Sequence, residues 1–117
     1  MKAKLIELLE TFGYPVSLQG SHSEDETVPE HEFTFWQFET NHTYYGNKIV
    51  LEEQVYRVFF YSTNPELANS IFKKVRPLLM KNGFHCSGDY DIESDEDNVD
   101  AREMEVRIKI KYKEEEN

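Results

Sequence analysis

The most regular pattern in the chain is an alternation of apolar and charged residues close to the C-terminus. Every second position is apolar, with Glu, Arg or Lys between, and the apolar residues are Met104, Val106, Ile108, Ile110 and Tyr112. Successive side chains of a strand point to opposite faces, so this period of two predicts a β-strand with one buried face and one face in water. Residues 113–117 come after this strand and are expected to form a flexible tail.

Two other segments have apolar residues at helical spacing. Residues 3–12 are predicted to form the first helix, and Gly13 is placed to end it in a left-handed conformation. The second helix is predicted to begin at Asn64, which suits the N-cap, with Pro65 at its first helical position. Pro77 lacks an N–H, so it is expected to kink this helix or to end its regular part.

Four further strands are predicted. A short one covers residues 14–18, a second one holds the aromatic run 33–38, a long central one covers 49–62, and another short one covers 84–90. In the aromatic run, Phe33 and Phe35 share one face, and Trp36 and Phe38 share the other. Residues 41–48, which include Gly46, are interpreted as a turn or loop.

The resulting element order is α-β-β-β-α-β-β. It predicts an α+β fold, in which a single antiparallel or mixed β-sheet has two helices packed on one face. A chain of 117 residues is expected to form a single domain, 1–117. Two polar, acidic loops are expected at 19–32 and 91–100.

Composition and charge narrow the class of protein. The 8 Phe, 7 Tyr and 1 Trp exclude a wholly disordered chain. Thirteen Lys and Arg against 23 Asp and Glu give a formal net charge of −10, and no basic cluster stands out, so nucleic-acid and membrane partners are not expected. Cys86 is the only cysteine, which excludes an intramolecular disulfide. A soluble protein of a reducing cytoplasm is expected.

Catalytic and metal-binding patterns are weak. Residues 89–100 have the acidic spacing of a calcium loop, but Ser94 stands where glycine is needed and Asp100 where a bidentate Glu is expected. A solvated loop is the favoured interpretation, with a calcium-regulated binding module as an alternative. The histidines are scattered, and no nucleophile elbow or phosphate-binding glycine loop occurs. We therefore expect no enzyme, no metal and no cofactor.

Aromatic and acidic residues are the remaining candidates for function. Trp36 and the Tyr44–Tyr45 pair are of the types that protein interfaces favour. Two acidic groups are further candidates and are hypothesised to become ordered only against a partner. The segments are Glu24–Glu26 and Asp91–Asp100, and their candidate contact residues are Glu24, Asp25 and Glu26 in the first and Asp91, Asp95 and Glu96 in the second.

The order of short motifs over roughly residues 5–112 resembles a known group. The motifs are Leu8–Val16, Gly20 with the acidic loop after it, Pro29 leading into Phe33–Trp36, Tyr44–Asn47, Phe60–Pro65, Gly83–Phe84, Gly88–Ile92 and Ser94–Glu96. In this order they are similar to small tail proteins of phages and prophages of Gram-positive bacteria, in the tail-completion group, also called tail terminators or tail-to-head joining proteins.

The resemblance implies a function and partners. It implies a structural virion protein that assembles into a hexameric ring, caps the tail tube, and joins it to the head connector. The implied partners are other copies of the chain, the tail tube protein and the head completion protein, in the virion tail or neck and, during assembly, in the host cytoplasm. A DNA mimic or another phage-encoded inhibitor of a host DNA-binding protein is the alternative, although the cations of the last strand do not fit a phosphate-like surface.

Overall fold

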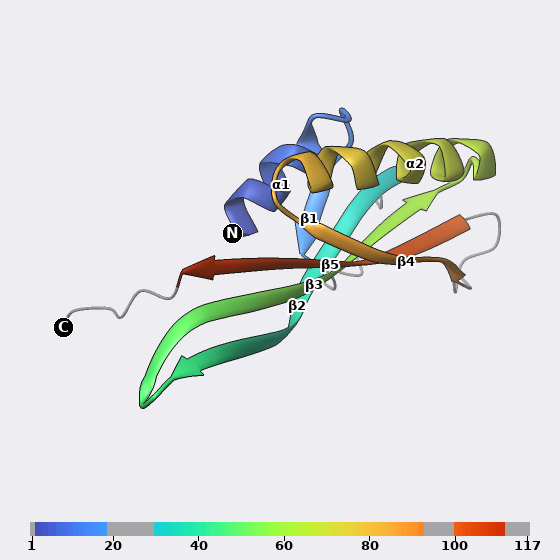
Figure 1. The fold of residues 1–117 in the computed structure, drawn as a ribbon. Coiled ribbons are helices and arrows are strands. Elements are labelled where there is room, and N and C mark those ends of the chain that lie inside the picture. Colours follow the sequence, from blue (N-terminus) through green and yellow to red (C-terminus); the bar gives the residue numbers. More distant parts are fainter. Residues whose placement is uncertain (1, 19–29, 93–99, 112–117) are drawn as a thin grey trace.

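Two helices and five strands make up the part of the chain that the computed structural model describes, residues 2–18, 30–92 and 100–111 (Figure 1). In chain order they are α1 (Lys2–Glu10), β1 (Val16–Leu18), β2 (His31–Tyr45), β3 (Lys48–Ser62), α2 (Pro65–Lys81), β4 (His85–Ile92) and β5 (Asp100–Lys111). The predicted order of elements is confirmed.

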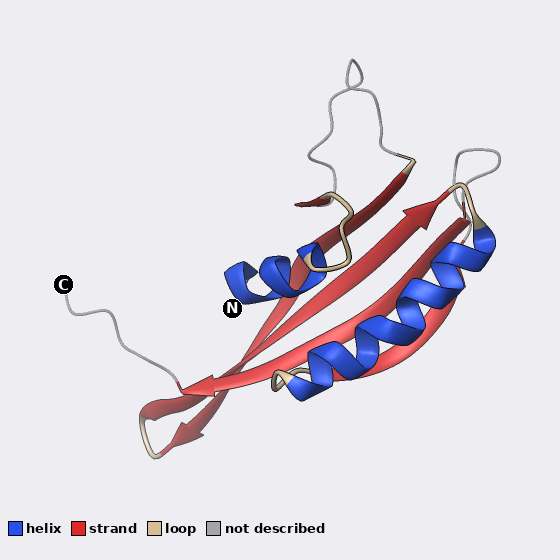
Figure 2. Cartoon of the chain, turned by 90° about the horizontal axis from the view of Figure 1, so that it is seen from above, coloured by secondary structure: helices blue, strands red, loops and turns tan. Residues whose placement is uncertain are grey.

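The described strands form one mixed sheet in the order β1-β2-β3-β5-β4. β1 pairs with β2 in parallel, and the other pairs are antiparallel. β3 is the middle strand, as the sequence predicted. Both helices lie on the same side of the sheet, as the two views show (Figures 1 and 2). The chain therefore has an α+β fold.

The core fills the space between the helices and the facing side of the sheet. Phe33 and Phe60 stand opposite each other on β2 and β3, with ring centres 4.7 Å apart, and the Tyr14 ring meets Phe60 edge-on at 5.5 Å. Other members of this cluster include Leu5, Leu9, Phe35, Tyr56, Val58, Phe72, Val75, Leu79, Met104 and Val106. The predicted alternation is confirmed, because Met104, Val106 and Ile108 are buried while the residues between them are at least partly exposed.

The ends of α2 follow the predicted chemistry. The Asn64 side-chain oxygen accepts hydrogen bonds from the backbone N–H groups of Glu66 and Leu67, which satisfies two donors of the first turn. At the other end Gly83 has a φ of 92°, a conformation that favours glycine. Pro77 does not end the helix, which continues to Lys81. Pro77 lies on the exposed side of the helix together with Lys73, whose carbonyl lacks its helical donor.

The predicted loop at 41–48 is wrong. β2 extends to Tyr45 and β3 begins at Lys48, so that only Gly46 and Asn47 connect them, and Gly46 has a φ of 63°. The polar residues of this stretch are exposed on both faces of a long hairpin, and such a stretch has no hydrophobic period to reveal a strand.

Both predicted acidic loops are shorter than expected where the structure describes them. His31 and Glu32 belong to β2, Asp91 belongs to β4, and Asp100 begins β5. Strand pairing explains the shift, because Glu32 stands opposite Tyr61 and Asp91 stands opposite Arg102. The other residues of the two loops, 19–29 and 93–99, and the predicted tail lie outside the described residues.

Candidate interaction surfaces

The side of the sheet that faces away from the helices carries a row of aromatic side chains. We call this side the helix-free face. On β2, the Trp36 and Phe38 rings lie 5.7 Å apart, and on β3 the Phe59 and Tyr61 rings stack at 6.2 Å. Trp36 is 40% exposed. The solvated face of an antiparallel sheet is usually polar, so these rings mark the helix-free face as a candidate contact surface.

Charged residues from β3 and β5 lie on the same face as these rings. Arg57 donates a 3.1 Å hydrogen bond to Glu103 on β5, and its guanidinium lies over the Phe38 ring, 4.6 Å from the centre. Further along β5, Arg107 donates to Glu105 at 3.1 Å and to Glu53 of β3 at 3.2 Å. The acids and bases of this face are thus largely paired with each other.

The pairing fixes the charge state of Glu105. The hydrogen bond from Arg107 is the main cause that holds the pKa of this carboxyl below its usual value, and a 3.0 Å hydrogen bond from the Ser87 hydroxyl acts in the same direction. Glu105 also raises the pKa of Arg107. Both groups are therefore charged at neutral pH.

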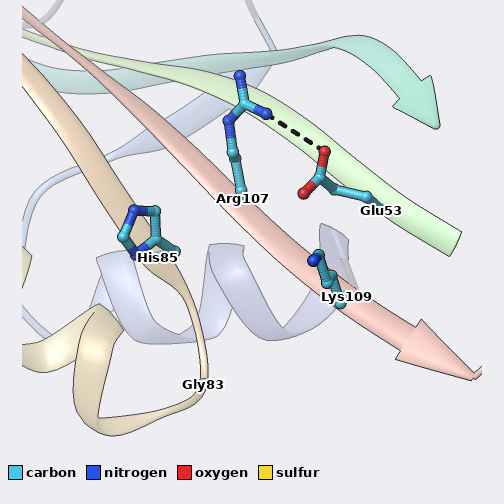
Figure 3. A pocket seen from close by; sticks show the side chains of 5 residues that line it. All are labelled: Glu53, Gly83, His85, Arg107 and Lys109. Carbon is cyan, nitrogen blue, oxygen red and sulfur yellow. Dashed lines mark hydrogen bonds and ion pairs between the residues drawn. The ribbon is translucent and has the colours of Figure 1, made fainter. Parts of the chain in front are cut away.

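Two shallow hollows open on this face beside β5. The larger, of about 350 Å³, is lined by Glu53, Gly83, His85, Arg107 and Lys109 (Figure 3). It lies where β4 begins, since His85 pairs with Arg107 and the chain before it leads away to Gly83. The smaller, of about 240 Å³, is lined by Arg57, Ser87, Gly88, Glu103 and Glu105. In both hollows the guanidinium group is already paired with a carboxylate.

The outer part of the β2–β3 hairpin projects past both helices, as Figures 1 and 2 show. We call residues 39–52 the arm. Its far end presents large apolar side chains to solvent: Tyr45 is 82% exposed, Tyr44 61%, Val50 40% and Leu51 37%. A two-stranded ribbon without cover is only marginally stable in water, so apolar residues at its tip are typical of a contact element.

A chain of hydrogen bonds joins the arm to the core. The buried Tyr56 hydroxyl donates to Gln54 at 2.6 Å, Gln54 donates to Glu52 at 2.6 Å, and a ring nitrogen of His42 lies 3.3 Å from Glu52. The hydrogen bond from Gln54 is the main cause that lowers the pKa of Glu52. Burial raises the pKa of Tyr56 to about 12, with the Glu52 charge as a second cause. These contacts anchor the base of the arm.

One contact has the composition of a nucleophile–base pair. A ring nitrogen of His31 lies 2.8 Å from the Ser62 hydroxyl. Ser62 is completely buried, and its hydroxyl donates to the Asn64 carbonyl and accepts from the Asn64 N–H. A substrate cannot reach this oxygen, so the pair serves to fix the turn before α2.

The structure separates the predicted candidate residues. Trp36 lies on the helix-free face opposite Arg57, whereas Tyr44 and Tyr45 lie at the end of the arm. Asp91 lies in β4. Glu24, Asp25, Glu26, Asp95 and Glu96 lie outside the described residues. Trp36 therefore does not form one site with the tyrosine pair.

Sequence analysis missed the charged part of the helix-free face. Arg57 and Glu103 are far apart in sequence, as are Glu53 and Arg107, and only the register of β3 with β5 brings them together. The last strand gave a partial indication of this charged surface, because Glu103, Glu105 and Arg107 alternate there with apolar residues. The partners on β3 had no such signal.

Comparison with known proteins finds no family model that matches this chain. No curated protein matches it either. Among the described residues, no group of three or more His, Cys, Asp or Glu side chains is placed to hold a metal ion. No helix in the described ranges has the length and apolar character that a membrane span requires.

Proposed function

We propose that this chain is a structural subunit of a phage or prophage tail, which caps the tail tube and joins it to the head connector as part of a hexameric ring. The order of motifs along the chain supports the family, and the surfaces described above support a role in assembly. The chain acts by binding other proteins, without a catalytic step.

The arm is the observation that carries the proposal. It extends the sheet past the helices, and Tyr44 and Tyr45 at its end are mostly exposed. Exposed aromatic residues on a projecting ribbon cost solubility and add nothing to the core. Their usefulness lies in contacts with another protein, where tyrosine contributes a large area at low entropic cost. A ring subunit needs such an element to reach its neighbour or the tube.

The helix-free face supports a second contact. Trp36 stands at the edge of an aromatic row, beside paired Arg57 and Glu103. A partner that covers the aromatic row can bury the rings without leaving Arg57 and Glu103 unpaired, because these two side chains already pair with each other within the chain. We assign this face to the tail tube protein or the head completion protein.

The alternative as a DNA mimic receives less support. A mimic requires carboxylates that are free and spaced like phosphates, but Glu53, Glu103 and Glu105 on the helix-free face are each paired with an arginine. Their negative potential is largely offset at short range.

Deletion of the gene from its phage or prophage tests the proposed function. Electron microscopy of the lysate should show filled heads beside unattached tails, some of irregular length, and a plasmid copy of the gene should restore joined particles. Intact tailed particles after deletion would reject the proposal. Competition of the purified protein with DNA for a host protein would then favour the mimic.

A further inference from the structure

The stretch of sheet at the base of the arm has three strands and two open edges. Three rows of residues cross it, in the order β2, β3, β5: Glu39–Val55–Arg107, Asn41–Glu53–Lys109 and Thr43–Leu51–Lys111. β1 pairs with β2 only at residues 33–35, and β4 reaches β5 only as far as Arg107. Among the described strands, nothing therefore pairs with the outer edge of 36–45 or with the outer edge of 108–111.

Open strand edges are templates for pairing with another chain. Proteins that must stay monomeric shorten, cover or kink such edges. Here the free edge of β2 is long and holds no proline or lysine between residues 36 and 45, and register shifts interrupt it at Gln37/Glu39 and at Thr43/Tyr44. The free edge of β5 begins beside the hollow that His85 and Lys109 line (Figure 3).

The two edges carry opposite charge. Lys109 and Lys111 are exposed at the free end of β5, and Glu39 is exposed at the free edge of β2. All three occupy positions of the helix-free face. Each copy has a net charge of −10, so copies repel one another unless their contact places cations of one copy against acids of the next.

We propose that copies of this chain join by strand addition, with the free edge of β2 in one copy paired to residues 108–111 of β5 in the next. This inference rests on the proposed function only for the closure of the joints into a ring. The two edges are different surfaces, so the contact is head-to-tail and generates a ring or a filament, in contrast to a two-fold dimer.

The directions of the strands specify the joint further. β2 and β5 both run antiparallel to β3, so they run in the same direction. A rotation that keeps this direction pairs β5 of one copy in parallel with β2 of the next. A relative shift of two residues, which a ring takes up by tilting its strands against the ring axis, keeps every side chain on its face and places Lys109 beside Glu39 of the neighbour. β2 of the neighbour must diverge from β5 before Glu39, because β4 occupies the edge of β5 up to Arg107. The Glu39 side chain then lies at the hollow beside Lys109.

Charge reversal tests the joint with the purified full-length chain. Sedimentation velocity of the wild type at roughly 1 to 500 µM and low salt should show larger species that grow with concentration, because association follows mass action. Lys109→Glu should weaken the association about tenfold or more. Adding Glu39→Lys to that variant should restore it. Lys73→Glu, which makes the same charge change on the exposed side of α2, is the matched control and should behave as the wild type.

Amide hydrogen exchange measures strand pairing directly, because a change of charge does not by itself protect backbone amides. Strand addition should protect backbone amides within 38–41 and 108–111 in the concentrated sample relative to the dilute one. A wild type that is monomeric over the whole range, or association without protection at these edges, overturns the proposal. Stronger association of the Lys109→Ala variant would also overturn the proposal, because it would mean that Lys109 prevents strand pairing at this edge.

The outcomes separate this joint from the proposed function. If deletion of the gene leaves tails unattached while Lys109→Glu associates normally, the tail role stands and the joint is wrong. If the charge reversal and its rescue succeed while deletion leaves intact particles, the joint stands and the tail role is wrong.

Discussion

The guanidinium of Arg57 lies over the ring of Phe38 and donates to the carboxylate of Glu103 at the same time. This arrangement holds a charged side chain flat against the helix-free face, where a free arginine would extend into solvent. The aromatic row and the Arg57–Glu103 ion pair are therefore parts of one continuous surface.

Arg57→Ala should lower the free energy of unfolding by about 1 kcal/mol, because it removes one exposed cation–π contact and one partly exposed ion pair. Urea unfolding of Arg57→Ala, Phe38→Ala and the double variant measures the coupling of the two side chains. A coupling of about 0.5 kcal/mol or more is expected. Strictly additive effects would show that the ring does not hold the guanidinium.

Phe60 and Phe59 are neighbours in sequence on opposite faces of β3. Phe60 is completely buried and packs on Phe33, so Phe60→Ala should cost about 3–5 kcal/mol of stability. Phe59 is partly exposed on the helix-free face, so Phe59→Ala should cost clearly less and should instead weaken binding to a tail partner. Urea unfolding and a pull-down with tail tubes measure the two effects. Equal losses of stability would contradict the assignment of the faces.

The N-cap of α2 is a local contribution that can be measured by itself. Asn64→Ala removes the acceptor of two backbone N–H groups and should cost about 1 kcal/mol. Asn69→Ala, at an exposed position within the same helix, is the control and should be neutral or slightly stabilising, because alanine is the better helix former. Thermal unfolding of both variants gives the comparison, and a neutral Asn64→Ala would reject the cap.

The ionisation of Glu105 makes the free energy of unfolding depend on pH. Its pKa is lower in the folded chain than its usual value of 4.5, so its contribution is complete above that value and is lost as the pH falls through the lower, folded pKa. The stability difference between wild type and Glu105→Gln should be constant near neutral pH and should shrink below about pH 4.5. Urea unfolding across this range tests it, with Glu7→Gln on the exposed side of α1 as the control for loss of a carboxylate. A difference that is independent of pH would contradict the pairing with Arg107.

The sequence predicted those features that depend on local chemistry or on a period. The Asn64 cap follows from the residue type, and the division of Phe33 and Phe35 from Trp36 and Phe38 follows from the period of two. The arm could not be predicted from the sequence, because residues 39–45 are exposed on both faces and so have no apolar side. The pairing of Arg57 with Glu103 and the two open edges depend on register and strand length, which no pattern along one segment specifies.

Substitution of the tyrosines at the end of the arm should affect assembly without affecting folding. Tyr44 and Tyr45 belong to no buried cluster among the described residues, so Tyr44→Ser with Tyr45→Ser should change the free energy of unfolding by no more than about 0.5 kcal/mol per site. The same variant should fail to restore joined particles in a phage that lacks the gene, because the contact area at the tip is lost. Met80→Ser, which removes an exposed apolar side chain from the end of α2, is the matched control and should restore them. A folded Tyr44→Ser, Tyr45→Ser variant that yields normal numbers of joined particles would remove the arm from assembly. The helix-free face would then be the surface on which the tail role depends.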